Sequence, residues 1–301
     1  MKPNFFRSPI FLLYIGGIVV FVVAAAFWWT KVYLGPYNVY WGMLENNFST
    51  AGVSKRITQT SNGTELNQLL VSTFGAQNAV HASTTLKTAK NTVQTETIST
   101  PDKDSVRYTD IKTTQKTKLG KPFDFSPILG KWASNKLTNN NSAGTASGLF
   151  TQTVLGIMGG NLLPQGNLPA ENRKDLLKRL HNEVVFDTSY TDIKKTRQNG
   201  RPVYTYTVNI QPVAYVGFEK AFAKSIGLKT LDSVDPNQYQ SEAAIKVTVS
   251  VDAWSHQLKA IDFPGQNHHE TYESYGVSLP VSDPKATITG AQLQSLLGKV
   301  Q

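Results

Sequence analysis

An uninterrupted apolar segment near the start of the chain places the strongest constraint on how the chain folds. Residues 8–30 carry no charged side chain, and nearly every residue from Ile10 to Trp29 is apolar. Twenty residues of α-helix rise about 30 Å, which matches the hydrocarbon thickness of a bilayer. We therefore expect residues 9–31 to form a transmembrane signal-anchor helix.

The charges around this segment predict its orientation. Lys2 and Arg7 precede it, and Lys31 is the basic residue that closely follows it. The positive-inside rule then predicts that residues 1–8 are cytoplasmic and that residues 36–301 form an extracytoplasmic domain. The expected location is the cell membrane, with a single span and with the lipid bilayer as a partner.

A cleaved signal peptide is the alternative interpretation of the same segment. Ala24–Ala26 offers small residues of the kind that signal peptidases accept. However, the apolar run continues past Ala26, and Trp28, Trp29 and Tyr33 would suit the outer headgroup region of an uncleaved helix. We favour the anchor, and both interpretations export the same domain.

Composition narrows the class of the exported domain. The chain has no cysteine, which excludes disulfides, thiolate nucleophiles, cysteine metal ligands and a lipid-modified cysteine anchor. Residues 36–301 are long enough to bury a core without such cross-links. Charged residues make up only 17% of the chain, while Thr, Ser, Asn and Gln are plentiful. This mixture favours a β-rich extracytoplasmic protein.

Positive charge suggests an anionic partner surface. The net charge is +9, and about +6 remains after the three basic residues around the apolar segment are subtracted. A lysine-rich stretch over 112–141, with one acidic residue, is predicted to be a long surface loop. Either this stretch is simply solvated, or it contacts anionic lipid or wall polymer. The candidate contact residues are Lys112, Lys116, Lys118 and Lys121.

Hydrophobic periodicity predicts strands interrupted by amphipathic helices. Apolar–polar alternation marks strands, with Lys90–Asn91 and Asn199–Gly200 as hairpin turns. Helical spacing of apolar residues marks the helices, and Thr289 is placed to cap the last one. The expected strands lie within 54–114 and at 184–193, 202–210, 243–252, 257–263 and 268–275, and the expected helices at 36–44, 149–163, 171–180, 214–226 and 289–297.

These elements predict an α+β fold: an N-terminal transmembrane helix followed by a large curved antiparallel sheet of roughly eight to ten strands, with helices covering one face. Two apolar helical stretches would then either fill the core or line an apolar ligand pocket. The candidate pocket residues are Phe150, Val154, Ile157, Met158, Tyr215, Phe218, Phe222 and Ile226.

Catalytic motifs are not evident in the sequence. His268-His269-Glu270 is the one tight cluster of metal-ligand types, but adjacent side chains of a strand point to opposite faces. No Gly-x-Ser-x-Gly turn and no lysine-bearing phosphate loop occurs. We therefore expect no enzyme, no metal, no cofactor and no nucleic-acid partner.

The C-terminal third resembles a known superfamily. Residues 246–261 form a predicted strand, an Asp-containing turn and a return strand, followed by Thr271–Gly276, Val277–Pro280 and a closing helix. Upstream, the Asn199–Gly200 hairpin, the strand 203–210 and the helix 214–226 follow the same order. This order resembles the LolA/LppX-like lipoprotein carriers.

The resemblance implies an open or half β-barrel whose helix-covered concave face holds acyl chains, with lipids or lipoproteins handled at the cell envelope and no bond chemistry. The chain departs from the family pattern because it has no lipobox cysteine and carries its own anchor. We thus expect a membrane-anchored protein that binds lipid or another hydrophobic ligand. The alternative is a non-catalytic surface or secretion-system assembly module with an envelope protein as partner.

Overall fold

The computed structural model describes residues 9–75, 78–100, 103–136, 162–227, 231–232, 234–277, 280–285 and 287–300, with the side chains of 9–16, 135 and 136 left out. The fold is α+β, as the sequence predicts: one large mixed sheet of thirteen strands that does not close, with five α-helices among the described residues. Four of the predicted pocket residues lie outside the described ranges, namely Phe150, Val154, Ile157 and Met158.

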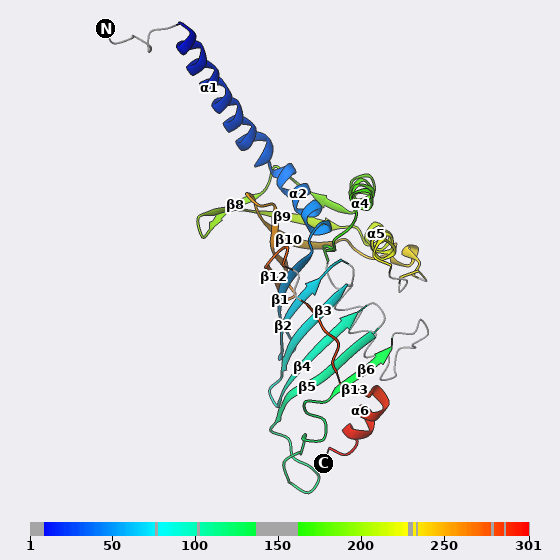
Figure 1. The fold of residues 1–301 in the computed structure, drawn as a ribbon. Helices are drawn as coiled ribbons and strands as arrows, with labels where there is room; N and C mark the ends of the chain where they lie inside the picture. The colour runs from blue at the N-terminus through cyan, green and yellow to red at the C-terminus, as the bar shows by residue number, and fades with distance from the viewer. Residues whose placement is uncertain are drawn as a thin grey trace, which may run out of the picture.

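The chain begins with a helix that stands away from the body (Figure 1). Helix α1 spans Pro9–Phe27 and continues as a π-helical segment over Trp28–Tyr33, after which α2 spans Pro36–Phe48. Within the described residues no single helix is long and apolar enough to cross a membrane, although the pair Gly17–Tyr33 and Pro36–Phe48, bent by 70°, meets that test together. Pro36 suits the first position of α2 because a helix needs no N–H there.

The strands and the later helices follow in a regular order (Figure 1). The bounds are β1 Gly52–Ser61, β2 Thr64–Thr73, β3 Ala79–Lys87, β4 Asn91–Thr100, β5 Lys103–Thr113, β6 Trp132–Lys136, α4 Ala170–Asn182, β7 Phe186–Thr188, β8 Lys194–Gln198, β9 Arg201–Ile210, α5 Pro212–Ser225, β10 Ile245–Asp252, β11 Gln257–Phe263, β12 His268–Glu273, β13 Thr287–Thr289 and α6 Gly290–Leu297.

Hairpin connections build most of the sheet, whose order is β13-β6-β5-β4-β3-β2-β1-β12-β11-β10-β9-β7, with β8 also paired to β9. Neighbouring strands are antiparallel except β13 and β6, which are parallel. The prediction of eight to ten wholly antiparallel strands was therefore wrong in both respects. The missed strands are short or lie in polar stretches: β13 has three residues, and β6 lies inside the predicted lysine-rich loop.

Turn chemistry explains where the hairpins reverse. Asn199 and Gly200 have φ angles of 50° and 78°, as the predicted tight hairpin requires. Asn62 and Gly63 repeat this geometry between β1 and β2, with φ angles of 50° and 74°. At the other end of the chain, the side chain of Thr289 caps α6 in a capping box with Gln292.

Helices cover the sheet mainly at the end that carries α1. Helix α2 packs on β10 and β11, and α4 packs against α2 and α5. Figure 1 shows this helical end above a long blade formed by β1–β5, with α6 beside β6 and β13 at the far end. The main hydrophobic core lies under α2, α4 and α5, whereas Ile57, Leu70, Val80 and Ala82 form a separate small cluster on the blade.

Candidate functional site

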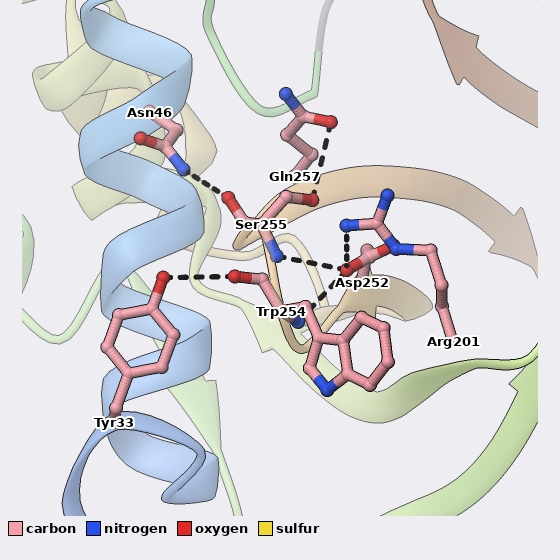
Figure 2. A network of polar contacts seen from close by, with 7 residues as sticks. All are labelled: Tyr33, Asn46, Arg201, Asp252, Trp254, Ser255 and Gln257. Carbon is pink, nitrogen blue, oxygen red and sulfur yellow. Dashed lines mark hydrogen bonds and ion pairs between the residues drawn. The ribbon is translucent and has the colours of Figure 1, made fainter. Parts of the chain in front are cut away.

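A tight turn between β10 and β11 lies at the base of the N-terminal helix. Asp252, the last residue of β10, organises this turn: its Oδ1 accepts hydrogen bonds from the backbone N–H of Trp254 (2.9 Å) and of Ser255 (3.0 Å). Arg201, at the start of β9, pairs with the same carboxylate at 2.8 Å (Figure 2). Because a short side-chain acceptor satisfies two turn amides, the turn is held in one geometry.

The helical segments bind the carbonyls of this turn. Figure 2 shows that the Tyr33 hydroxyl donates to the Trp254 carbonyl (2.9 Å) and that Asn46 Nδ2 donates to the Ser255 carbonyl (2.9 Å). Asn46 Nδ2 also lies 2.9 Å from the His256 carbonyl, to which it donates as well. Tyr33 lies on the π-helical segment and Asn46 on α2. The turn is therefore attached on both sides of the bend that follows Tyr33. We call these contacts, from Tyr33 and Asn46 to the turn 252–256, the junction.

His256 fills the centre of the junction. Its ring stacks on the Tyr33 ring with centroids 4.4 Å apart, and the residue is only 8% exposed. Burial lowers the pKa of His256 below its ordinary value, against the opposing effects of a hydrogen bond with the backbone of Tyr33 and the charge of Asp252. A neutral ring at pH 7 suits this stacked position. Gly42 leaves room for the ring, because a Cβ there would lie 2.3 Å from Nδ1.

A second polar network is buried between β1 and β12. Lys55 Nζ lies 3.4 Å from Glu270 Oε2, with both side chains at most 4% exposed. Glu270 also accepts a hydrogen bond from the Tyr272 hydroxyl and lies 3.0 Å from His268 Nε2. Burial by itself raises the pKa of Glu270, but the bond with His268, the charge of Lys55 and the bond from Tyr272 bring the pKa below its ordinary value. The opposite charges of Lys55 and Glu270 compensate each other in this buried site, so removal of one partner would leave an uncompensated buried charge.

Glu219 on α5 adds a carboxyl group close to this region. Its Oε1 is buried without a partner among the described residues, and its side chain is hydrogen-bonded to Tyr215. Burial raises the pKa of Glu219 to about 8, and the bond from Tyr215 opposes that rise. Glu219 is therefore largely protonated at neutral pH, which suits the apolar underside of α5.

The predicted pocket residues on α5 lie in or beside the main core. Phe218 is fully buried and Phe222 is 5% exposed, and their rings lie 6.1 Å and 5.9 Å from that of Phe48. Tyr215 and Ile226 are partly buried against the same core. The structure thus brings three aromatic side chains and Ile226 together along one side of α5, and we call this group the aromatic layer. Their role in holding a ligand stays a prediction, as does that of the four residues outside the described ranges.

The predicted cationic contact residues lie far from the N-terminal helix. Lys112 is the penultimate residue of β5, and Lys116, Lys118 and Lys121 follow in an exposed loop. β1 leaves α2 and runs down the blade, so the antiparallel order places the end of β5 at the blade tip, as Figure 1 shows. Ten strand residues span on the order of 30 Å. These lysines therefore share no surface with the base of α1.

The histidine pair on β12 divides between the two faces of the sheet, as predicted. His268 contacts Glu270, whereas His269 contacts Asp262 on β11. Among the described residues no group of three or more His, Cys, Asp or Glu side chains is arranged to hold a metal ion.

The junction is the feature that sequence reasoning missed. Asn46 is more than two hundred residues from Asp252 and His256 along the chain, and only the fold brings it to their turn. The Asp-containing turn itself was visible in the sequence. Comparisons with known proteins add no assignment: no protein-family model matches the chain, and no curated protein matches its sequence significantly.

Proposed function

We propose that the chain is a membrane-tethered envelope protein that binds a lipid or another apolar ligand on the helix-covered face of its open sheet. The observation that carries this proposal is the aromatic layer under α5, placed on a sheet that does not close and joined to an apolar helix. This arrangement resembles the half-barrel of LolA/LppX-like carriers, to which we assign the domain as part of the proposal.

The exposed surface of α1 supports the tether. Side chains from Ile18 to Phe27 are apolar, and Phe21 is 73% exposed while Phe27 is 63% exposed. Soluble proteins rarely expose so large a contiguous apolar surface, and a bilayer would cover it. Helix α1 alone has nineteen residues, a rise of about 29 Å, and Trp28, Trp29 and Tyr33 follow at its end.

The aromatic layer supports the ligand site. Phe218 and Phe222 pack their rings between α5 and Phe48 on α2. Phe218 also contacts Phe186 on β7, and Ile226 extends this surface to the C-terminal end of α5. An acyl chain that enters beneath α5 would replace contacts among rings with contacts to its methylene groups. Each buried methylene contributes about 0.8 kcal/mol, so a chain of moderate length binds without specific polar contacts.

A fluorescent fatty acid tests this proposal. The full chain in nanodiscs is titrated with cis-parinaric acid, and the wild-type signal is compared with that of Ile226→Trp, which fills the end of the α5 layer. We expect Ile226→Trp to weaken binding at least tenfold. Leu297→Trp is the matched control, because Leu297 is an aliphatic residue at the end of α6 and is 41% exposed. Equal binding by all three proteins, or no binding beyond that of empty nanodiscs, would contradict the proposal.

A non-catalytic assembly module is the second candidate, and the junction favours it. Contacts on both sides of the bend hold the domain in one orientation relative to α1, as a module that positions envelope partners would require. A cross-linking screen in intact cells distinguishes the two. A stable protein partner combined with no lipid uptake would favour assembly.

A further inference from the structure

The β8–β9 hairpin is strongly basic and lies beside the base of α1. Its residues 194–201 include four cationic side chains, Lys194, Lys195, Arg197 and Arg201, and no acidic one. Every residue of β8 is exposed. Figure 1 shows the hairpin projecting sideways from the body at the level of α2, close to where α1 leaves it.

Contacts fix the base of the hairpin to the end of the N-terminal helix. Tyr204 on β9 donates its hydroxyl hydrogen to the Leu34 carbonyl at 3.2 Å, directly after the π-helical segment. Lys195 is the register partner of Tyr204, and its Nζ lies 5.0 Å from the centre of the Tyr204 ring. Lys195 thus lies on the side of the sheet that faces the start of α2.

Alternation along the strand places a second charge on this side. Arg197 pairs with Pro202 in the register, and side chains two residues apart share a face, so Arg197 and Lys195 point the same way. On the same face of β9, the Tyr206 hydroxyl donates to the Pro36 carbonyl at 2.8 Å. The side of the hairpin that carries Lys195 and Arg197 therefore faces the linker between α1 and α2.

The junction adds an aromatic group at the base of the hairpin, next to Arg201, which pairs with Gln198 and therefore lies on the face opposite to Arg197. Trp254 is 45% exposed, and the Arg201 guanidinium lies 5.8 Å from the centre of its ring (Figure 2). The Trp254 carbonyl accepts the hydrogen bond from Tyr33. Tryptophan and basic side chains are the residues that settle at the headgroup level of membranes.

We infer that the β8–β9 hairpin, together with Trp254, is a docking surface for anionic lipid headgroups of the leaflet that α1 enters. This inference rests on the membrane tether in the proposed function. Each basic side chain near an anionic membrane surface contributes about 1 kcal/mol, and the attraction falls off within a Debye length. Because α1 attaches the domain to the membrane at one point, headgroup binding by Lys194, Lys195 and Arg197 would fix the orientation of the domain relative to the bilayer.

Charge on β8 also has a simpler role, namely protection of an exposed sheet edge. That role predicts no dependence on lipid composition, and the experiment separates the two. The chain has no cysteine, so a single introduced cysteine carries a probe at one defined position.

The test places a bimane label on Gln198→Cys in the full chain, in nanodiscs of phosphatidylcholine with or without one quarter phosphatidylglycerol. Quenching by lipids that carry a spin label at the headgroup reports contact. We expect at least twofold stronger quenching with phosphatidylglycerol, and loss of the difference in 0.5 M salt. The triple change Lys194→Gln, Lys195→Gln and Arg197→Gln should remove the difference as well.

Matched controls make each outcome decisive. The triple change Lys116→Gln, Lys118→Gln and Lys121→Gln removes the same charge at the blade tip and should leave quenching at position 198 unchanged. Equal quenching in both lipid mixtures, or no effect of the hairpin triple change, overturns the inference. A label on Val22→Cys, read with lipids brominated in the acyl chain, tests the tether separately. If Val22→Cys is quenched and Gln198→Cys is not, only the docking surface is wrong; if neither is quenched, the tether is wrong too.

Discussion

Gly42 is the position where one methyl group should uncouple the N-terminal helix from the domain. In wild-type protein α2 passes close to the β10–β11 turn, and an added Cβ would lie 2.3 Å from Nδ1 and 3.0 Å from Cγ of His256. Neither atom belongs to a flexible chain end, because the His256 ring is stacked against Tyr33. Gly42→Ala must therefore displace the ring from the stack.

The expected magnitude follows from three contributions. Alanine in a helix interior is favoured over glycine by about 1 kcal/mol. Overpacking costs about 1–3 kcal/mol, and loss of an aromatic stack costs about 0.5–1.5 kcal/mol. The net expectation is a destabilisation of about 2 kcal/mol, which lowers the Tm of a domain of this size by about 4–8 °C.

Thermal unfolding of the full chain in detergent, followed by circular dichroism, measures this effect. Gly217→Ala is the matched control, because Gly217 is also inside a helix and the nearest atom to its added Cβ, on Arg179, would lie at an ordinary 3.8 Å. That variant should be as stable as wild type or slightly more so. The double change Gly42→Ala and His256→Gly should recover part of the loss, since glycine accepts the φ of 51° at position 256. A Gly42→Ala protein as stable as Gly217→Ala would refute the reasoning.

Two further predictions concern buried carboxyl groups. Burial raises the pKa of Glu219 from 4.5 to about 8, so the stability that the protonated group contributes is complete below pH 4.5 and is lost as pH rises through 8. At 1.36 kcal/mol per pH unit, the free energy of unfolding should fall by at most about 5 kcal/mol in total. Urea unfolding between pH 5 and 9 should show this decrease in wild type and a smaller one in Glu219→Gln. Glu270→Gln leaves the buried Lys55 without its counter-charge and should cost about 3–5 kcal/mol in the same assay. Glu65→Gln, which breaks the exposed pair with Lys87, should cost less than about 1 kcal/mol, and equal losses for the two variants would contradict this account.

Local signals in the sequence predicted much of the fold. The alternation in 243–275 gave three strands within two residues of their observed ends, because β10 and β11 bury aliphatic residues on one face and β12 buries Glu270 and Tyr272 on one face. Asn199–Gly200 and Thr289 fixed a turn and a helix start through chemistry that acts over only a few residues. Long-range pairing was not predictable in this way: the parallel partner of β13 lies in a lysine-rich stretch more than one hundred and fifty residues earlier.

The candidate site likewise contains residues that the sequence predicted and residues that it did not. Phe218, Phe222 and their neighbours were found by helical spacing, which correctly predicted one apolar side of α5. The junction and the basic hairpin depend on which strands lie beside α2, and spacing along the chain carries no such information. The density of lysines led to the prediction of cationic contact residues in 112–121, whereas the structure places the basic residues of 194–201 next to the base of α1.

Native mass spectrometry of the full chain, extracted gently from the membranes of the cells that make it and released from detergent in the gas phase, tests the central claim most directly. The account predicts a population heavier than the polypeptide by the mass of one lipid or fatty acid, which is depleted in Ile226→Trp and retained in Leu297→Trp. A bare polypeptide mass in all three proteins, unchanged after incubation with excess fatty acid, would contradict the account.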